Sequence, residues 1–282
     1  MHLNQQTAVI TGSSRGIGRA IALRMAQEGA RVVVNGTDAS RVNAVVEEIR
    51  QNGGVAIGIA EPVHTMEGGA RIISAATAEF GQVDILVNNA GIIRDQMAHK
   101  LGEEDWDAVI SIHLKGAFSC IRAALPGMRE RRQGCIINMT STAGLTGTAG
   151  QLNYSAAKAG LLGMTWTLAL ELRHYGISVN AIAPAALTDM TAPYIERARR
   201  DAEAAGQNLP DYWRVGTPEE AAELAVALSL PQTRGISGEI FSVNGGDIGL
   251  WARPKHELLT SRTSGHWKAS EIAAELLTES LN

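Results

Sequence analysis

Short apolar runs alternate with segments of helical periodicity along most of this chain, and this alternation limits the folds that it can adopt. The apolar runs occupy residues 7–11, 30–35, 55–59, 83–87, 135–139, 177–182 and 239–243. Helical segments between them cover residues 19–29, 39–51, 67–80, 103–131, 153–175 and 218–230. Strands that alternate with helices form parallel sheets covered on both faces. The sequence therefore predicts an α/β fold with a single doubly wound parallel sheet and helices on both faces.

We expect one domain over residues 1–250 and a C-terminal extension over residues 251–282. A chain of 282 residues is long enough for one large α/β domain. After Pro184 the pattern becomes irregular and partly helical up to Val215. The extension is expected to be either a helix packed on a neighbouring subunit or a loosely ordered chain end. Its aromatic and apolar residues are Trp251, Trp267, Ile272, Leu276, Leu277 and Leu281.

Charge and cysteine content restrict the partners and the compartment. The net charge is −4 and no basic cluster is present, so neither nucleic acid nor an anionic membrane is an expected partner. Cys120 and Cys135 both lie in apolar stretches, which indicates buried thiols in a reducing compartment. The N-terminus lacks signal-peptide features, and we expect no apolar run of transmembrane length. The sequence predicts a soluble, cytoplasmic protein without a metal site.

A glycine-rich turn follows the first apolar run and precedes the first helix. In this setting glycines let the backbone approach a pyrophosphate at the N-terminus of a helix. The spacing is GxxxGxG rather than the commoner GxGxxG, and such a turn can also serve close packing alone. The candidate cofactor-binding residues here are Gly12, Ser14, Arg15, Gly16, Ile17 and Gly18.

Tyr154 and Lys158 lie four residues apart in a predicted helix, so both side chains lie on one face. A lysine ammonium close to a tyrosine hydroxyl lowers its pKa, which makes the tyrosine a usable proton donor or acceptor for an alcohol–ketone pair. A hydroxyl at the end of the run 135–139, within residues 140–142, could hydrogen-bond the same substrate oxygen. Taken alone, the pair could also be an ordinary exposed helix pair.

Together, TGSSRGIG, NNAG, Ser141 and YSAAK resemble the short-chain dehydrogenase/reductase family over residues 5–250. The resemblance implies a Rossmann-like fold and selects Ser141, thirteen residues before Tyr154, to hold the substrate oxygen. It implies that Tyr154 exchanges the proton and that Lys158 lowers the pKa of Tyr154 and binds the nicotinamide ribose. It also places Asn89, Ala90 and Gly91 at the cofactor.

A histidine occupies the position where this family usually has an asparagine in its long central helix. His113 can donate and accept hydrogen bonds, so we expect it to serve the proton relay that links the lysine to solvent. The alternative is a core histidine with satisfied hydrogen bonds. The surrounding run GIIRDQMAHKLGEEDWDAVISIHLKGAF resembles the dehydrogenase part of peroxisomal multifunctional β-oxidation enzymes.

The substrate suggested by this similarity is a 3-oxoacyl or 3-hydroxyacyl thioester. The NAGIxRD element, which includes Arg94 and Asp95, is also frequent in β-ketoacyl thioester reductases. Arg94 and Asp95 could instead tie a loop to the surface, and a cyclic or steroid-like alcohol is the alternative substrate. A cofactor-sensing regulator without catalysis is a further class, disfavoured by the intact Ser141, Tyr154 and Lys158.

The end of the second apolar run predicts the choice of cofactor. An acidic residue there would accept the ribose hydroxyls of NAD and repel a 2′-phosphate, but this chain has Gly36 followed by Thr37. Because Arg15 could pair with a 2′-phosphate, we expect NADP, with NAD as the less favoured alternative through Asp38. The resemblance further implies adenine contact through the backbone N–H of Val63.

Two further regions complete the sequence predictions. The resemblance implies a contact of Pro184 and Thr188 with the nicotinamide end, with Thr191 as an alternative to Thr188. Residues 190–213 are the expected substrate lid, with wall candidates Met190, Tyr194, Tyr212 and Trp213. The helical segments 103–131 and 153–175 carry apolar residues around much of their circumference, which predicts a homo-oligomer, most simply a tetramer.

Overall fold

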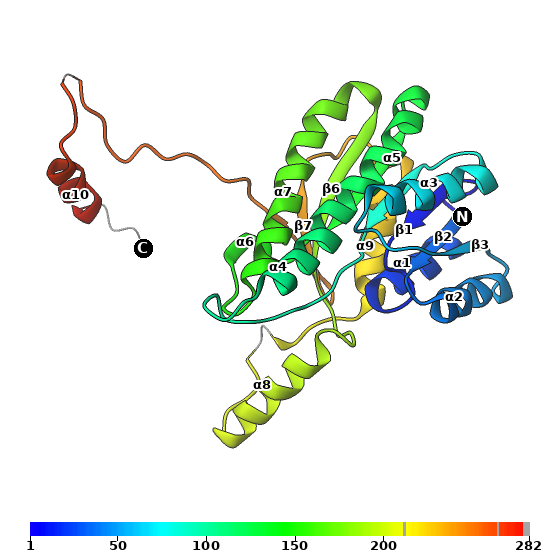
Figure 1. The fold of residues 1–282 in the computed structure, drawn as a ribbon, viewed down its shortest axis with the longest axis horizontal. Coiled ribbons are helices and arrows are strands. Elements are labelled where there is room, and N and C mark those ends of the chain that lie inside the picture. Colours follow the sequence, from blue (N-terminus) through cyan, green and yellow to red (C-terminus); the bar gives the residue numbers. More distant parts are fainter. Residues whose placement is uncertain (211–212, 264, 279–282) are drawn as a thin grey trace. The chain divides into compact units, whose positions relative to one another are not determined.

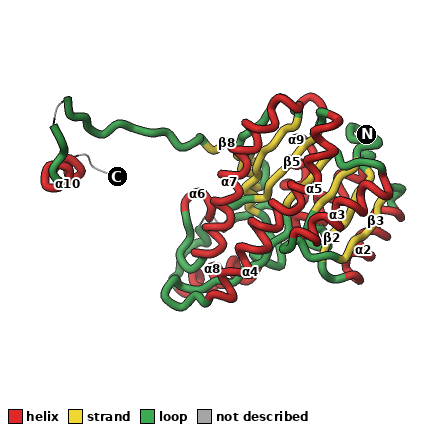
Figure 2. The backbone as a smooth tube through the Cα atoms, turned by 45° about the horizontal axis from the view of Figure 1, so that its top comes forward, coloured by secondary structure: helices red, strands yellow, loops and turns green. Residues whose placement is uncertain are grey.

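The strands form one sheet in which all but the last are parallel, as the computed structural model shows for the described residues 1–210, 213–263 and 265–278 (Figures 1 and 2). The strand order is β3-β2-β1-β4-β5-β6-β7-β8. The prediction of a doubly wound α/β fold is confirmed. The strands are β1 (Thr7–Ile10), β2 (Arg31–Gly36), β3 (Val55–Ala60), β4 (Ile85–Asn88), β5 (Gly134–Met139), β6 (Ile177–Ala185), β7 (Ile240–Asn244) and β8 (Asp247–Trp251).

Helices cover both faces of this sheet because successive strand residues point to opposite sides. Ile10 and Val34 pack with α1 (Gly16–Gln27), α2 (Ala39–Gln51) and α9 (Pro218–Ser229). Val9 and Val33 pack on the other face with a second helix layer. That layer consists of α3 (Met66–Phe80), α5 (Gly116–Arg131) and α7 (Leu152–Leu172).

The edge strand β8 is the main departure from the predicted fold. The sequence analysis ended the last strand at residue 243 and expected a purely parallel sheet, but β8 pairs antiparallel with β7. Asn244 pairs with Asp247 across Gly245 and Gly246, and Gly245 has φ +58°. A two-residue glycine loop is a frequent hairpin connection because glycine adopts positive φ without steric cost.

The predicted helix 103–131 is continuous but changes its winding. It consists of α4 (Glu103–Ile110), a π-helical turn η1 (Ser111–Lys115) and α5, which continues through Pro126 to Arg131. Its length and apolar composition would suffice to cross a membrane, which corrects the expectation that no run approaches that length. Cys120, Ile121 and Met128 are instead buried against the sheet, as in the core helix of a globular domain.

The segment between β6 and α9 contains a well-defined helix, α8 (Ala192–Ala204), where only partial helicity was expected. Figure 1 shows α8 extending away from the sheet. Shorter elements in the same unit are α6 (Ala143–Thr146) and the 3₁₀ turns η2 (Arg173–Tyr175) and η4 (Pro231–Thr233).

The chain divides into two units, Met1–Trp251 and Ala252–Asn282. The second unit contains α10 (Ala269–Thr278), whose start is stabilised by an ion pair between Arg262 and Glu271 at 2.9 Å. Ile272 and Leu276 are exposed within it, and Leu281 lies outside the described residues. Packing of this helix on a neighbouring subunit stays a prediction.

Candidate active site

The predicted site residues come together at the carboxyl ends of the central strands. The glycine turn follows β1, the NNAG segment follows β4 and Ser141 follows β5. Since β1 and β4 are neighbours, the chain reverses its direction of strand addition between them. Ligands of open α/β sheets bind at such a switch point.

The glycine turn and the NNAG segment are packed so closely that side chains would not fit. A Cβ on Gly12 would lie 2.7 Å from the Cα of Ala90, and one on Gly18 would lie 2.4 Å from the Asn89 amide nitrogen. The Thr11 hydroxyl accepts hydrogen bonds from the backbone N–H groups of Asn89 and Ala90 at 3.0 and 3.1 Å. These contacts hold a bare backbone surface at the carboxyl end of β1, suited to a close-lying pyrophosphate.

The N-terminus of α1 leaves its backbone donors without a side-chain cap. Its N-cap residue, Arg15, is extended and makes no capping hydrogen bond, and the first turn has no acidic residue. In contrast, Asp38 caps α2 and Thr65 caps α3. Unsatisfied N–H groups and the helix dipole together favour an anion such as a phosphate.

On the adenosine side, the acid that would favour NAD is occupied elsewhere. The Asp38 carboxylate accepts from the backbone N–H of Arg41 at 3.1 Å and pairs with its guanidinium at 3.4 Å. Gly36 is buried, and a Cβ there would lie 2.9 Å from the Ser14 hydroxyl. Arg15 and Thr37 are exposed at the same end of the sheet.

The residues predicted to contact the adenine and the nicotinamide make the following contacts within the chain. Val63 is buried, and its carbonyl accepts from the Ser119 hydroxyl at 2.9 Å. The Thr188 methyl lies 3.7 Å from where a Cβ on Gly16 would stand, which puts Thr188 beside the glycine turn. The Thr191 hydroxyl is committed to the Ala186 carbonyl at 2.8 Å. The contact of Thr188 with the nicotinamide stays a prediction. Pro184 and Ala185 are the last two residues of β6, and both are half-buried.

Lys158 and Tyr154 lie side by side on α7, but burial dominates their ionisation. The Lys158 ammonium donates to the Met139 carbonyl at 2.6 Å and lies 5.5 Å from the centre of the Tyr154 ring. Burial lowers the pKa of Lys158 to about 7. Tyr154 as a whole residue is half-buried, but its hydroxyl is desolvated, which raises the pKa of Tyr154 to about 12. A hydrogen bond with Ser141 acts in the opposite direction and lowers this pKa. The lowering of this pKa by Lys158 stays a prediction.

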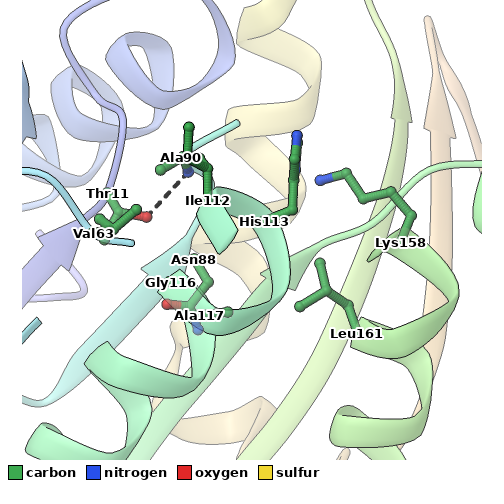
Figure 3. Close-up of a pocket in the computed structure, with 10 residues that line it drawn as sticks. All are labelled: Thr11, Val63, Asn88, Ala90, Ile112, His113, Gly116, Ala117, Lys158 and Leu161. Atoms are coloured by element: carbon green, nitrogen blue, oxygen red, sulfur yellow. Dashed lines mark hydrogen bonds between the residues drawn. The ribbon is translucent and has the colours of Figure 1, made fainter. Parts of the chain in front are cut away.

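His113 lies beside both of these side chains. Its ring meets the Tyr154 ring edge-on with centroids 5.2 Å apart, and Figure 3 shows the Lys158 ammonium pointing toward the imidazole. A Cβ on Gly91 would lie 2.2 Å from the imidazole, so the NNAG glycine makes room for the ring. Nε2 contacts both the carbonyl and the N–H of Ile92, at 2.8 and 3.0 Å, and the tautomer decides which bond forms.

The second ring nitrogen, Nδ1, is buried and has no hydrogen-bond partner in the described part of the chain. Burial and the neighbouring Lys158 charge lower the pKa of His113 to about 3, so the imidazole is neutral. A neutral imidazole can pass a proton between its nitrogens. The relay role of His113 stays a prediction.

A narrow pocket is lined both by the predicted cofactor-binding residues Val63 and Ala90 and by the predicted catalytic residues His113 and Lys158 (Figure 3). One of its lining residues, Asn88, begins a buried hydrogen-bond chain that the sequence analysis missed. Asn88 donates to Asn138 at 2.9 Å, and Asn138 donates to Thr165 at 2.9 Å. The lining residues are Thr11, Val63, Asn88, Ala90, Ile112, His113, Gly116, Ala117, Lys158 and Leu161.

Asp95 also has a larger part in the site than predicted. Its carboxylate accepts hydrogen bonds from Gln151, at the start of α7, and from Tyr194, within the lid expected from the sequence. No local pattern singles out Gln151, because its role depends on a loop 56 residues away.

Of the other wall candidates, Met190 is half-buried and Tyr212 lies outside the described residues. No cluster of three or more metal-ligating side chains occurs among the described residues.

Comparison with known proteins gives the family. The family model for short chain dehydrogenases matches residues 6–199. The 3-oxoacyl-(acyl-carrier-protein) reductase of Synechocystis sp. is 44% identical over 249 residues, which cover 87% of this chain and 98% of that protein. The corresponding reductase of Vibrio cholerae is 41% identical, with 87% and 98% covered. The crystal structure of a short chain dehydrogenase from Mycobacterium avium matches with a TM-score of 0.86 and 36% identity, covering 99% of this chain and 97% of that one. The chain therefore belongs to the short-chain dehydrogenase family and is an oxidoreductase that interconverts ketones and secondary alcohols.

Proposed function

We propose that this enzyme reduces a 3-oxoacyl thioester to the 3-hydroxyacyl thioester with NADPH. The observation that carries the proposal is the 44% identity with a reductase of that substrate class along 98% of its length. The neighbouring Ser141, Tyr154 and Lys158 supply the proton chemistry that such a reduction needs.

The residues present fit a nicotinamide dinucleotide. The bare turn formed by Gly12, Gly16 and Gly18, together with the uncapped start of α1, would hold the pyrophosphate. Exposed Arg15 would pair with a 2′-phosphate, while Asp38 is engaged in capping α2. Both features favour NADP over NAD. When bound, the nicotinamide supplies the hydride, and that chemistry belongs to the cofactor.

The chain's own groups handle the proton. With its pKa raised to about 12, Tyr154 keeps its hydroxyl proton at neutral pH and can donate it to the substrate oxygen as the carbonyl carbon gains the hydride. The Ser141 hydroxyl would hold the same oxygen. Lys158 and His113 would then return a proton to Tyr154. The net change is one hydride and one proton added across the C=O bond.

An assay of NADPH oxidation with a panel of substrates tests this proposal. The panel contains acetoacetyl and longer 3-oxoacyl thioesters of coenzyme A and of acyl carrier protein, with cyclic and steroid ketones as the alternative class. We expect kcat/KM for the thioesters to exceed that for the cyclic ketones by at least about 100-fold, as for sites that recognise a polar substrate group. Preference for a cyclic ketone would reject the thioester while leaving the reaction type intact. Cofactor binding without turnover of any ketone would favour the non-catalytic regulator.

We further propose that the enzyme works in the cytoplasm on a small-molecule or carrier-bound substrate, without nucleic-acid or membrane partners. Cys120 and Cys135 are buried free thiols, which supports a reducing compartment. The negative net charge of −4 gives no electrostatic attraction to nucleic acid or anionic lipid.

A further inference from the structure

One carboxylate oxygen joins three segments around the reaction site. Asp95 Oδ2 accepts a hydrogen bond from the Tyr194 hydroxyl at 2.7 Å and another from the Gln151 side-chain amide at 2.8 Å. Asp95 belongs to the loop after β4, Gln151 is the N-cap residue of α7, and Tyr194 lies in the first turn of α8. Hydrogen bonds to a charged acceptor are stronger than those between neutral groups.

The loop that carries Asp95 is itself held in place. The backbone N–H of Gln96 donates to the Gly150 carbonyl at 2.8 Å, and Gln96 forms a bridge with Gln151. Asp95 is half-buried, and its other oxygen, Oδ1, is buried without a hydrogen-bond partner among the residues described. The carboxylate therefore stands at a fixed position between α7 and α8.

Helix α8 has a side-chain hydrogen bond to this carboxylate. It extends from the body of the domain (Figure 1), and its buried residues are Ile195 and Ala202. Within the described ranges, Tyr194 is the one residue of α8 whose side chain hydrogen-bonds to another segment. Desolvation and the Asp95 charge raise the pKa of Tyr194 to about 12, so its hydroxyl stays protonated and keeps donating.

We propose that Asp95 is a positioning residue that latches α8 to the start of the catalytic helix through Tyr194 and Gln151. The kinetic consequences rest on the proposed reductase activity.

Substituting Tyr194→Phe tests the latch. It removes the hydroxyl that donates to Asp95 and leaves the charge of the Asp95 carboxylate in place. We expect KM for the thioester to rise roughly tenfold, the scale of one hydrogen bond to a charged group, with kcat within about twofold of the wild type. Hydrogen exchange of the amides in α8 should quicken as well, since the helix loses its tether. The matched control is Tyr175→Phe, which removes a hydroxyl bonded to Arg129 at the far end of α7. Unchanged KM and unchanged exchange in Tyr194→Phe would overturn the latch.

Substituting Asp95→Asn tests the charge. The amide oxygen can still accept from Tyr194 and Gln151, so KM should change less than in Tyr194→Phe. The matched control is Asp105→Asn, which changes a carboxylate that pairs with Arg94 and should leave KM at the wild-type value. A larger rise of KM in Asp95→Asn than in Tyr194→Phe would contradict a latch that acts through hydrogen bonds to the Asp95 oxygen.

The exchange measurement separates this inference from the proposed function. If no thioester is a substrate, the proposed function fails, yet faster exchange of α8 in Tyr194→Phe would still support the latch. If thioesters are reduced but both variants match the wild type, the inference alone fails.

Discussion

At the scale of single residues, burial acts in opposite directions on the two central ionisable groups. It lowers the pKa of Lys158 to about 7 and raises that of Tyr154 to about 12. Near pH 7 the tyrosine is therefore protonated and the lysine is close to half-charged. This combination suits a donor that gives up a proton only when a more basic oxygen, such as a developing alkoxide, lies beside it.

Removing the Tyr154 hydroxyl isolates this step. We expect Tyr154→Phe to lower kcat by about 100-fold or more, the usual contribution of a general acid. NADPH binding, measured by fluorescence titration, should persist because the glycine turn is untouched. Near-normal turnover in this variant would rule out Tyr154 as the proton donor.

His113 gives a prediction about stability in acid. Its pKa is about 3 in the folded protein and 6.5 ordinarily, so below pH 6.5 the unfolded chain binds a proton that the folded protein does not. Stability therefore falls as pH drops from 6.5 toward 3, by about 1.4 kcal/mol per pH unit and about 2 kcal/mol at pH 5. In His113→Asn this part of the loss should vanish.

Urea unfolding at pH 7 and pH 5 measures the effect of His113. The difference in unfolding free energy between the two pH values should be smaller by about 2 kcal/mol in His113→Asn than in the wild type. The control His99→Asn changes an exposed histidine and should leave that difference unaltered. An equal loss in wild type and His113→Asn would mean that His113 is not a buried neutral group.

The sequence predicted which residues form the site better than it predicted their pKa values and hydrogen-bond partners. The spacing of Tyr154 and Lys158 correctly indicated two neighbouring side chains on one helix face. It carried no information on desolvation or on the Met139 carbonyl that holds the ammonium, because both arise from strands distant in sequence. Asp95 was similarly underestimated, since its partners lie 56 and 99 residues away.

At the scale of elements, the N-termini of α1 and α2 differ in a way that bears on the cofactor. Helix α1 begins with the exposed Arg15 and no cap, whereas α2 begins with Asp38 as its cap. Releasing Asp38 toward a ribose would remove a cap that is typically worth about 1 kcal/mol. The proposed preference for NADP is consistent with this difference, since Asp38 is engaged in capping α2 and Arg15 is exposed at the start of α1.

We expect the preference for NADPH over NADH to depend on Arg15. We expect Arg15→Ala to lower kcat/KM for NADPH by about 10- to 100-fold, the scale of a charge-assisted hydrogen bond, and to leave the value for NADH within about twofold. Arg19→Ala is the control, because that guanidinium one turn along α1 is paired with Glu48. A wild type that strongly prefers NADH would contradict this assignment of the cofactor.

A gain of NAD preference is harder to engineer. Gly36→Asp introduces the missing acid, but its Cβ would lie 2.9 Å from the Ser14 hydroxyl and 3.1 Å from a Val42 methyl. We therefore expect this variant to move preference toward NAD and to lose activity with both cofactors. Steady-state kinetics with NADH and with NADPH gives kcat/KM for each cofactor. The ratio of the two values reports the change in preference, and a decrease of both values reports the loss of activity.

The bounds of helices and strands were predictable where the hydrophobic periodicity and the glycines of the turns indicated the same ends. The strands and helices from β1 to α3 follow the predicted ranges closely, because each has an unbroken apolar pattern. Strand β8 was missed because its exposed, alternating residues give no buried run, although the glycine pair before it is a hairpin signal. The π-helical turn at His113 was not predicted, because the periodicity of residues 103–131 does not distinguish a π-helical turn from an α-helical one.

At the scale of the whole molecule, the matches differ in how much of the chain they cover. The reductases of Synechocystis and Vibrio cholerae cover 87% of this chain, while the Mycobacterium avium structure covers 99%. The match with the latter therefore extends into residues 252–282.

The last prediction concerns assembly. Several apolar residues of the two long helices are buried inside the chain, among them Val109, Ile121, Leu161 and Leu162. Phe118 on α5 is 47% exposed and Leu170 on α7 is 70% exposed, so a surplus remains, although smaller than the sequence indicated. Burying a large apolar side chain is worth about 1.5–3 kcal/mol, which favours covering these positions with a second copy of the chain.

Sedimentation at micromolar concentration should therefore show a homo-oligomer, with a tetramer expected, rather than a species near the chain mass of 29.9 kDa. Phe118→Glu and Leu170→Glu should each shift the distribution toward smaller species, because a charge buried at an interface without a partner is strongly unfavourable. Val55→Glu adds the same charge at the exposed start of β3, at the other edge of the sheet from β8, and should leave the assembly unchanged. A wild-type protein that sediments as a monomer would show that the exposed Phe118 and Leu170 are tolerated by a single chain.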